Sequence, residues 1–230
     1  MKLQPIKPHV LAARVLPDVA GGLRDRLSLT PAQRSIGLLT CTSDDALYAA
    51  LDEGTKAANV DVVYARSFYA GAAHASGPLS GEVMGIFAAS DPDEITSAMA
   101  ATLRYLEERA WFYTADDRGK LAFFPHVIPS VGRYLATQAG IEPGTPMAYL
   151  IAPPIEAIVA LDAAMKAADV ELKVYYAPPS ETNFAGGLLI GQLPECEAAA
   201  AAFQETVLDL AAHPHRLSPH PALDELSARF

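Results

Sequence analysis

The feature of this sequence that most constrains its fold is an internal repeat. The segment Leu51–Val60 (LDEGTKAANV) matches Leu161–Val170 (LDAAMKAADV) at six of ten positions, 110 residues later. In the same order, Val15–Val19 (VLPDV) matches Val127–Val131 (VIPSV), 112 residues later. Chance similarity between two amphipathic helices could explain one such block but not several blocks in sequence. The chain is therefore predicted to contain two successive copies of one unit.

The spacing between the copies shortens along the chain, which indicates shorter loops in the second copy. Pro92 and Pro194 each open an apolar-periodic stretch, and they are only 102 residues apart. The largest deletion falls in the glycine-rich segment 70–81 (AGAAHASGPLSG). Small residues allow close backbone approach, and glycine lets a loop refold. This segment is therefore either a pore loop at a symmetry axis or a flexible surface loop.

Each copy has the element order β-α-β-α-β-β-α, which predicts a compact α+β unit with helices packed on a mostly antiparallel sheet. In the helix of the second copy that begins near Pro154, the apolar stripe is Ile155, Ile158, Leu161 and Met165. Asp91 is predicted to cap a helix that has Pro92 at its first position. The predicted strands are 9–17, 35–41, 60–70, 82–89, 120–129, 146–154, 170–179 and 186–193, and the helices are 18–27, 43–59, 91–106, 130–140, 154–165 and one that includes Phe203 and Val207.

Composition excludes several classes of protein. Half of the residues are hydrophobic (51 %) and the net charge is −10, so neither a disordered chain nor a non-specific nucleic-acid binder is expected. No apolar run approaches the roughly 18 residues that span a bilayer, and the N-terminal stretch does not match a signal peptide. Cys41 and Cys196 form no zinc-ligand pattern. The sequence contains no nucleophile elbow, P-loop or dinucleotide-binding fingerprint, so no enzyme is predicted.

Several long segments then point to a known family. The segments RSIGLLTCTSDD, VVYARSFYAGAAH, GEVM, PMAYLIAPPIEA and PPSETNF resemble the L-type shell proteins of the ethanolamine-utilisation bacterial microcompartment. The similarity runs from about Pro8 to about Pro214. It implies two circularly permuted bacterial microcompartment (BMC) domains, at residues 1–113 and 114–217, followed by a C-terminal extension, 218–230.

The resemblance also implies a mode of assembly and a cellular location. Three chains would form a homotrimer that mimics a hexagon, and the trimers would tile with other shell proteins around metabolic enzymes in the cytoplasm. A central pore would open and close, and ethanolamine would favour the closed state. Independently, two near-copies in one chain present pseudo-symmetric surfaces, whose heterologous contacts close into rings. No membrane and no nucleic-acid partner is expected.

The resemblance assigns ligand-binding roles to residues from both copies, which places the site at the junction between them. Carboxylates would face the ammonium group of ethanolamine, an aromatic ring would add cation–π attraction or form a wall, and polar groups would bind the hydroxyl. The residues so assigned are Asp44, Asp45, Glu82, Phe112, Thr182, Asn183 and Phe184.

Each of these residues also has a purely structural interpretation. Asp44 and Asp45 are ordinary first-turn residues of a helix, where carboxylates suit the helix dipole. Glu82 could be a solvated charge at a strand end, Phe112 a core residue, and Ser180–Asn183 a polar turn.

No cofactor is required by the resemblance, but a zinc ion at the pore region is one possibility. Glu82 is its candidate ligand by family analogy, and three copies of His74 could meet a metal at the three-fold axis.

Two hypotheses from different classes thus remain at the sequence level. The first is a structural shell protein with a gated pore and a small-molecule site. The second is a soluble small-molecule-binding regulator or enzyme built on a duplicated α+β domain. The acidic net charge fits both.

Overall fold

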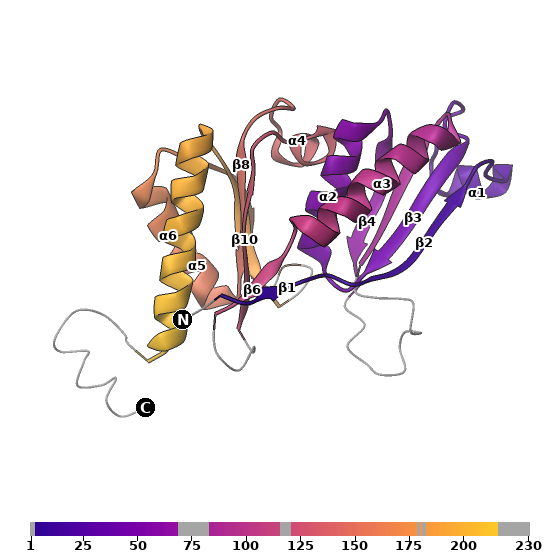
Figure 1. Ribbon diagram of the computed structural model, residues 1–230. Helices are drawn as coiled ribbons and strands as arrows, with labels where there is room; N and C mark the ends of the chain where they lie inside the picture. The colour runs from indigo at the N-terminus through magenta and orange to yellow at the C-terminus, as the bar shows by residue number, and fades with distance from the viewer. Residues whose placement is uncertain (1–2, 69–82, 116–120, 179, 181–182, 216–230) are drawn as a thin grey trace.

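The computed structural model describes residues 3–68, 83–115, 121–178, 180 and 183–215. It contains two antiparallel sheets, and the predicted repeat is visible in their shared topology (Figure 1). The first sheet has the strand order β2-β3-β5-β4 and the second β1-β6-β7-β8-β10-β9. The first sheet comprises β2 (Val10–Leu16), β3 (Ser35–Cys41), β4 (Asp61–Ser67) and β5 (Val83–Ala89). The second comprises β1 (Pro5–Ile6), β6 (Phe112–Thr114), β7 (Ala122–Ile128), β8 (Met147–Ala152), β9 (Glu171–Tyr176) and β10 (Ala185–Ile190).

Helices occupy the same positions in both copies, with local sequence signals at their ends. The Asp91 side chain accepts a hydrogen bond from the Asp93 N–H, 2.8 Å away, so the predicted cap before Pro92 is confirmed. Gly140 ends its helix with φ 63°, a left-handed conformation that favours glycine. The helices are α1 (Gly21–Arg26), α2 (Asp44–Ala57), α3 (Pro92–Glu108), α4 (Arg133–Ala139), α5 (Pro154–Ala167) and α6 (Leu193–Ala212).

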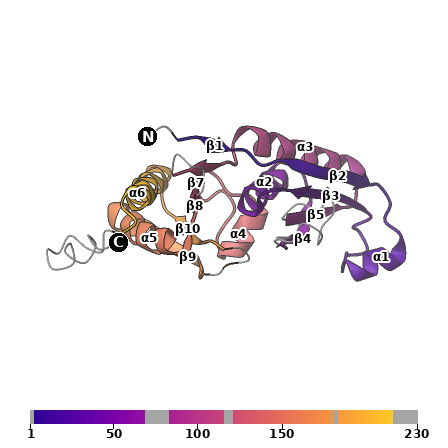
Figure 2. The ribbon, with the colours of Figure 1, turned by 90° about the horizontal axis from the view of Figure 1, so that it is seen from below.

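The elements form successive layers along the long dimension of the molecule. Helices α5 and α6 lie at one end, then the second sheet, then α2, α3 and α4, then the first sheet, with α1 at the other end (Figures 1 and 2). The largest core cluster joins the two copies, because Leu47 and Leu51 of α2 pack in it together with Phe124 and Tyr149 of the second sheet. The middle helices therefore have apolar neighbours on both sides.

Two features differ from the sequence prediction. The short strands β1 and β6 were not predicted, because runs of two and three residues carry no periodicity. They extend the second sheet beside β7, and the predicted domain boundary after residue 113 falls inside β6. The division into 1–113, 114–217 and 218–230 remains a prediction.

The predicted apolar stripe of α5 is wrong as a core stripe. Ile155, Ile158 and Met165 are exposed, whereas Leu161 is buried. The buried face of α5 consists mainly of small residues, Ala157, Ala160 and Ala164, which let the helix approach the second sheet and α6 closely. Its larger apolar side chains therefore point away from the chain's own core.

Candidate binding site at the junction of the two copies

Two carboxylates open helix α2 at the junction between the sheets. Asp44 and Asp45 are both 8 % exposed, and the Asp45 N–H donates to Asp44 Oδ1 at 2.9 Å. The first turn of a helix carries uncompensated N–H groups and the positive end of the helix dipole, which stabilise negative charge. The structural interpretation of these residues therefore holds, and their near-complete burial sets them apart from ordinary surface carboxylates.

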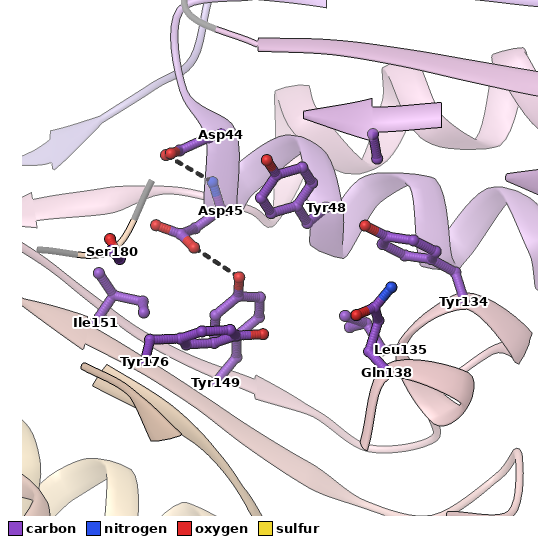
Figure 3. Close-up of a pocket in the computed structure, with 11 residues that line it drawn as sticks. Asp44, Asp45, Tyr48, Tyr134, Leu135, Gln138, Tyr149, Ile151, Tyr176 and Ser180 are labelled. Atoms are coloured by element: carbon purple, nitrogen blue, oxygen red, sulfur yellow. Dashed lines mark hydrogen bonds between the residues drawn. The ribbon is translucent and has the colours of Figure 1, made fainter. Parts of the chain in front are cut away.

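A cavity of about 160 Å³ lies beside Asp45 (Figure 3). The Tyr149 hydroxyl donates to Asp45 Oδ1 at 2.6 Å, and Tyr176 lies beside Tyr149 with ring centroids 6.1 Å apart. Burial, together with the negative charge of Asp45, raises the pKa of Tyr149 well above its ordinary value, so this hydroxyl remains a donor. The cavity is lined by Asp44, Asp45, Tyr48, Ala65, Tyr134, Leu135, Gln138, Tyr149, Ile151, Tyr176 and Ser180.

A second cavity, of about 150 Å³, lies on the other side of Asp44. Phe112 and Phe184 line it, with ring centroids 5.8 Å apart, and Phe112 also stacks on Phe124 at 4.9 Å. Phe112 is thus both a core residue and a cavity wall. Ile6, Lys7, Pro8, Thr42, Ser43 and Ala122 complete the lining.

The structure brings some of the predicted ligand-binding residues together. Asp44, Phe112 and Phe184 line one cavity, and Asp44 and Asp45 line the other. Asn183 is exposed and lines neither cavity.

The remaining predicted positions give no geometry. Glu82 and Thr182 lie outside the described residues, as do His74 and the segment 70–81.

Sequence reasoning missed the tyrosines of the Asp45 cavity. Tyr48, Tyr134 and Tyr176 come from three separate elements, so no local pattern links them. Tyr149 carried a usable signal, because it is the one residue with a polar side chain in the apolar strand MAYLIA. A buried polar atom requires a partner, and here the partner is Asp45.

A second buried carboxylate joins the copies. Asp52 of α2 is fully buried, and it accepts hydrogen bonds from the N–H groups of Gly132 at 2.6 Å and Leu135 at 2.9 Å. Burial raises the pKa of Asp52, and these two backbone hydrogen bonds act in the opposite direction. Asp52 thus caps α4 from another helix. The Arg133 N–H also donates to Thr55 Oγ1 at 3.0 Å, which reinforces this contact between α2 and α4.

Neither cavity has the donors expected of a metal centre. Among the residues that the structure describes, no group of three or more His, Cys, Asp or Glu side chains could hold a metal ion. A carboxylate with aromatic walls instead suits a small organic cation, which gains both charge attraction and cation–π attraction. Within the described ranges, no helix combines the length and apolar character needed to cross a bilayer.

Comparison with known proteins defines the class first. Residues 35–113 match the family model described as the BMC domain. The crystal structure of ethanolamine utilization protein EutL from Leptotrichia buccalis superimposes with a TM-score of 0.89 at 50 % identity, covering 93 % of this chain and 99 % of that one. A trimeric bacterial microcompartment shell protein, PduB, has the same fold, with a TM-score of 0.72 at 23 % identity over 87 % of this chain and 88 % of that one. The fold is therefore that of tandem-domain microcompartment shell proteins.

The particular family follows from curated relatives. The bacterial microcompartment shell protein EutL of Clostridium perfringens is 47 % identical over 214 residues, 93 % of this chain and 99 % of that protein. The EutL protein of Salmonella typhimurium is also 47 % identical, over 92 % of this chain and 97 % of that protein. The chain belongs to the EutL family of bacterial microcompartment shell proteins. It is a structural component of a microcompartment shell rather than an enzyme, which decides between the two hypotheses left by the sequence.

Proposed function

We propose that this shell protein forms a homotrimeric tile with a gated central pore, and that ethanolamine binds at the junction of the two copies and favours the closed state. Ethanolamine would have to bind the closed state more tightly than the open one, since a ligand shifts an equilibrium only through such a difference. Ethanolamine utilization appears in the name of the Leptotrichia relative, and PduB is named as trimeric. The two tandem units would supply six lobes around the three-fold axis.

The observation that carries the ligand proposal is the position of Asp44. This buried carboxylate borders both cavities, with Asp45 and Tyr149 on one side and Phe112 and Phe184 on the other. An ammonium group near Asp44 would be attracted by a charge that the helix dipole already stabilises, in surroundings with a low dielectric constant. The hydroxyl of ethanolamine would need a polar partner, and Thr182 and Asn183 are the candidates by family resemblance.

Isothermal titration with ethanolamine tests the site. Asp44→Asn and Asp45→Asn remove one negative charge each and keep an oxygen that can accept a hydrogen bond, so Asp45→Asn retains an acceptor for the Tyr149 hydroxyl. Loss of a charge-assisted contact is expected to weaken binding about tenfold or more. The matched control is Asp93→Asn, because Asp93 is a first-turn aspartate of α3 that lines neither cavity. Unchanged affinity in both site variants would exclude these carboxylates.

A zinc ion at the pore region is the remaining part of the proposal, with Glu82 as its ligand. Metal analysis of the purified trimer, before and after dialysis against a chelator, tests it. We expect zinc to be retained by the unaltered protein and reduced in Glu82→Gln. Equal zinc content in the two proteins would remove Glu82 as a ligand.

A further inference from the structure

Helices α2 and α5 are structural counterparts, and a matching hydrogen bond fixes their register. The Asn59 N–H, just after α2, donates to Glu94 Oε2 of α3 at 2.7 Å. The Asp169 N–H, just after α5, donates to Glu195 Oε2 of α6 at 2.9 Å. Asn59 and Asp169 are 110 residues apart, as are the two aligned repeat segments. The counterpart of Asp52 is therefore Asp162.

Helices α1 and α4 correspond in the same way. The Val19 N–H donates to the Arg34 carbonyl at 2.8 Å, and the Val131 N–H donates to the Thr145 carbonyl at 3.1 Å. Both bonds lie immediately before the short helix of their copy. Their offset of 112 pairs Leu135 of α4 with Leu23 of α1.

Counterparts that are buried at the junction are exposed at the two ends of the chain. Leu135 is 1 % exposed against α2, whereas Leu23 is 44 % exposed. Asp52 is fully buried, whereas the side chain of Asp162 is 60 % exposed. The difference arises because α2 and α4 meet within one chain, whereas α5 and α1 lie at opposite ends of it (Figures 1 and 2).

The outer face of α5 is also apolar. Ile155 is 71 % exposed, and three more large hydrophobic side chains on this helix are exposed. A solvated helix face normally carries polar residues, so a contiguous apolar face marks an interaction surface. The other three are Ile158, Val159 and Met165.

We propose that α5 of one chain packs against α1 of a second copy of the same chain, repeating between chains the contact that α2 makes with α4 within one chain. Asp162 then lies at the N-terminal turn of the neighbour's α1, in the position that Asp52 has at α4. The contact joins unlike faces, and such heterologous contacts close into a ring when the rotation permits. The inference rests on the proposed function only for the number of chains in that ring.

Charge on the two faces fits this pairing. The α1 end of this acidic chain carries Arg24 and Arg26, whereas α5 carries Glu156 and Asp162. Within the chain, Lys56 Nζ donates to the Ser130 carbonyl at 3.0 Å. The counterparts of these two residues, Lys166 and Asp18, are oppositely charged side chains.

One residue makes the contact between chains differ from the internal one. A Cβ atom at Gly132 would lie 2.4 Å from the Asp52 carbonyl oxygen, and the counterpart of Gly132 is Ala20. Since Ala20 has a Cβ atom, α5 and the neighbour's α1 must lie further apart than α2 and α4. The weaker fit suits a contact that forms after each chain has folded.

Cysteine cross-linking in the full chain tests the contact. Met165→Cys and Gly21→Cys place thiols at the counterparts of Thr55 and Arg133, which are hydrogen-bonded at the internal junction. Gly21 has room for a side chain, and both native cysteines are buried. The control pairs Met165→Cys with Thr137→Cys, an exposed position on α4. Mild oxidation should link the first pair between chains, giving covalent dimers and closed rings on a non-reducing gel, at least about tenfold more than the control.

Light scattering of the unaltered protein separates the two ways in which this could fail. A trimer whose Met165→Cys, Gly21→Cys variant forms no more inter-chain links than the control would overturn the α5–α1 contact and leave the trimer intact. A monomer at micromolar concentration would overturn both the trimer and the contact. As a second readout, Ile158→Glu should leave the melting temperature of the monomer unchanged but dissociate the trimer. A trimer unaffected by this charge would count against the contact.

Discussion

Helices α2 and α5 have nearly the same sequence in their LDxxxKAAxV segments but opposite surroundings. In α2, the aspartate of this segment is buried and caps α4. In α5, the corresponding aspartate is solvated and pairs with Lys166 at 2.6 Å. An exposed ion pair of this kind contributes little, typically below about 1 kcal/mol. A repeated segment therefore determines a helix twice but determines its environment only once.

The comparison also shows how the two copies divide their roles. Each copy offers one face to the copy that follows it, and only the first copy has a successor within the chain. The buried carboxylates and the tyrosine-lined cavity accordingly lie at the internal junction. The equivalent face of α5 instead has aliphatic residues, Ile155 in place of Asp45 and Ile158 in place of Tyr48.

The sharpest test of this asymmetry removes the same side chain from both helices. Asp52→Ala leaves the Gly132 and Leu135 N–H groups buried without their acceptor, and it should lower the free energy of unfolding by about 3 kcal/mol. Asp162→Ala should change it by less than about 0.5 kcal/mol in the monomer, because its side chain is solvated. Urea denaturation of both variants at one protein concentration measures the difference. Equal losses would mean that the two helices are not used differently.

A smaller effect is expected from exchanging the small residues that precede α4 and α1. Gly132→Ala introduces a Cβ atom 2.4 Å from a backbone oxygen, which should destabilise the chain by about 2 kcal/mol. Ala20→Gly should be neutral or slightly stabilising, because glycine is a better N-cap residue than alanine. Thermal unfolding of the two variants gives the comparison, and a neutral Gly132→Ala would show that the α2–α4 contact is looser than described.

The smallest effect concerns acid. His126 of β7 lies with Nε2 2.8 Å from the Tyr105 hydroxyl of α3, and its counterpart in the first copy is the exposed Arg14. Burial, and then the positive charges of Lys56 and Arg109, lower the pKa of His126 to about 4. The unfolded chain takes up this proton near pH 6.5, and the folded chain does so only near pH 4. The folded state therefore loses stability as the pH falls through that window.

We expect this loss to be on the order of 1–2 kcal/mol, because the ring keeps some contact with solvent. It is measured as the difference between the unaltered protein and His126→Gln, which cannot titrate but can still accept from Tyr105. Asp52, with its raised pKa, acts in the opposite sense, and it contributes equally to both proteins. Parallel stability curves between pH 6.5 and 4 would contradict the assignment to His126.

Much of the fold was predictable from local pattern. The β-branched and apolar runs of β3, β5 and β10, and the capped helix after Asp91, are local signals that the tertiary structure kept. The α5 stripe was not predictable, because periodicity reports that a face is apolar and not what covers it. For the candidate site, Asp44 and Asp45 followed from the helix start and the family resemblance. Tyr134 and Tyr176 did not, since they approach Asp45 only when separate elements assemble.

The sequence by itself determined the duplication, the order of strands and helices, and the acidic start of α2, because each depends on residues close together in the chain or repeated along it. Only the tertiary structure decided which copy of a repeated segment is buried. Burial depends on which surface arrives from elsewhere, and for α2 that surface is α4 of the same chain. For α5 the chain supplies none, which leaves its apolar side chains facing outward.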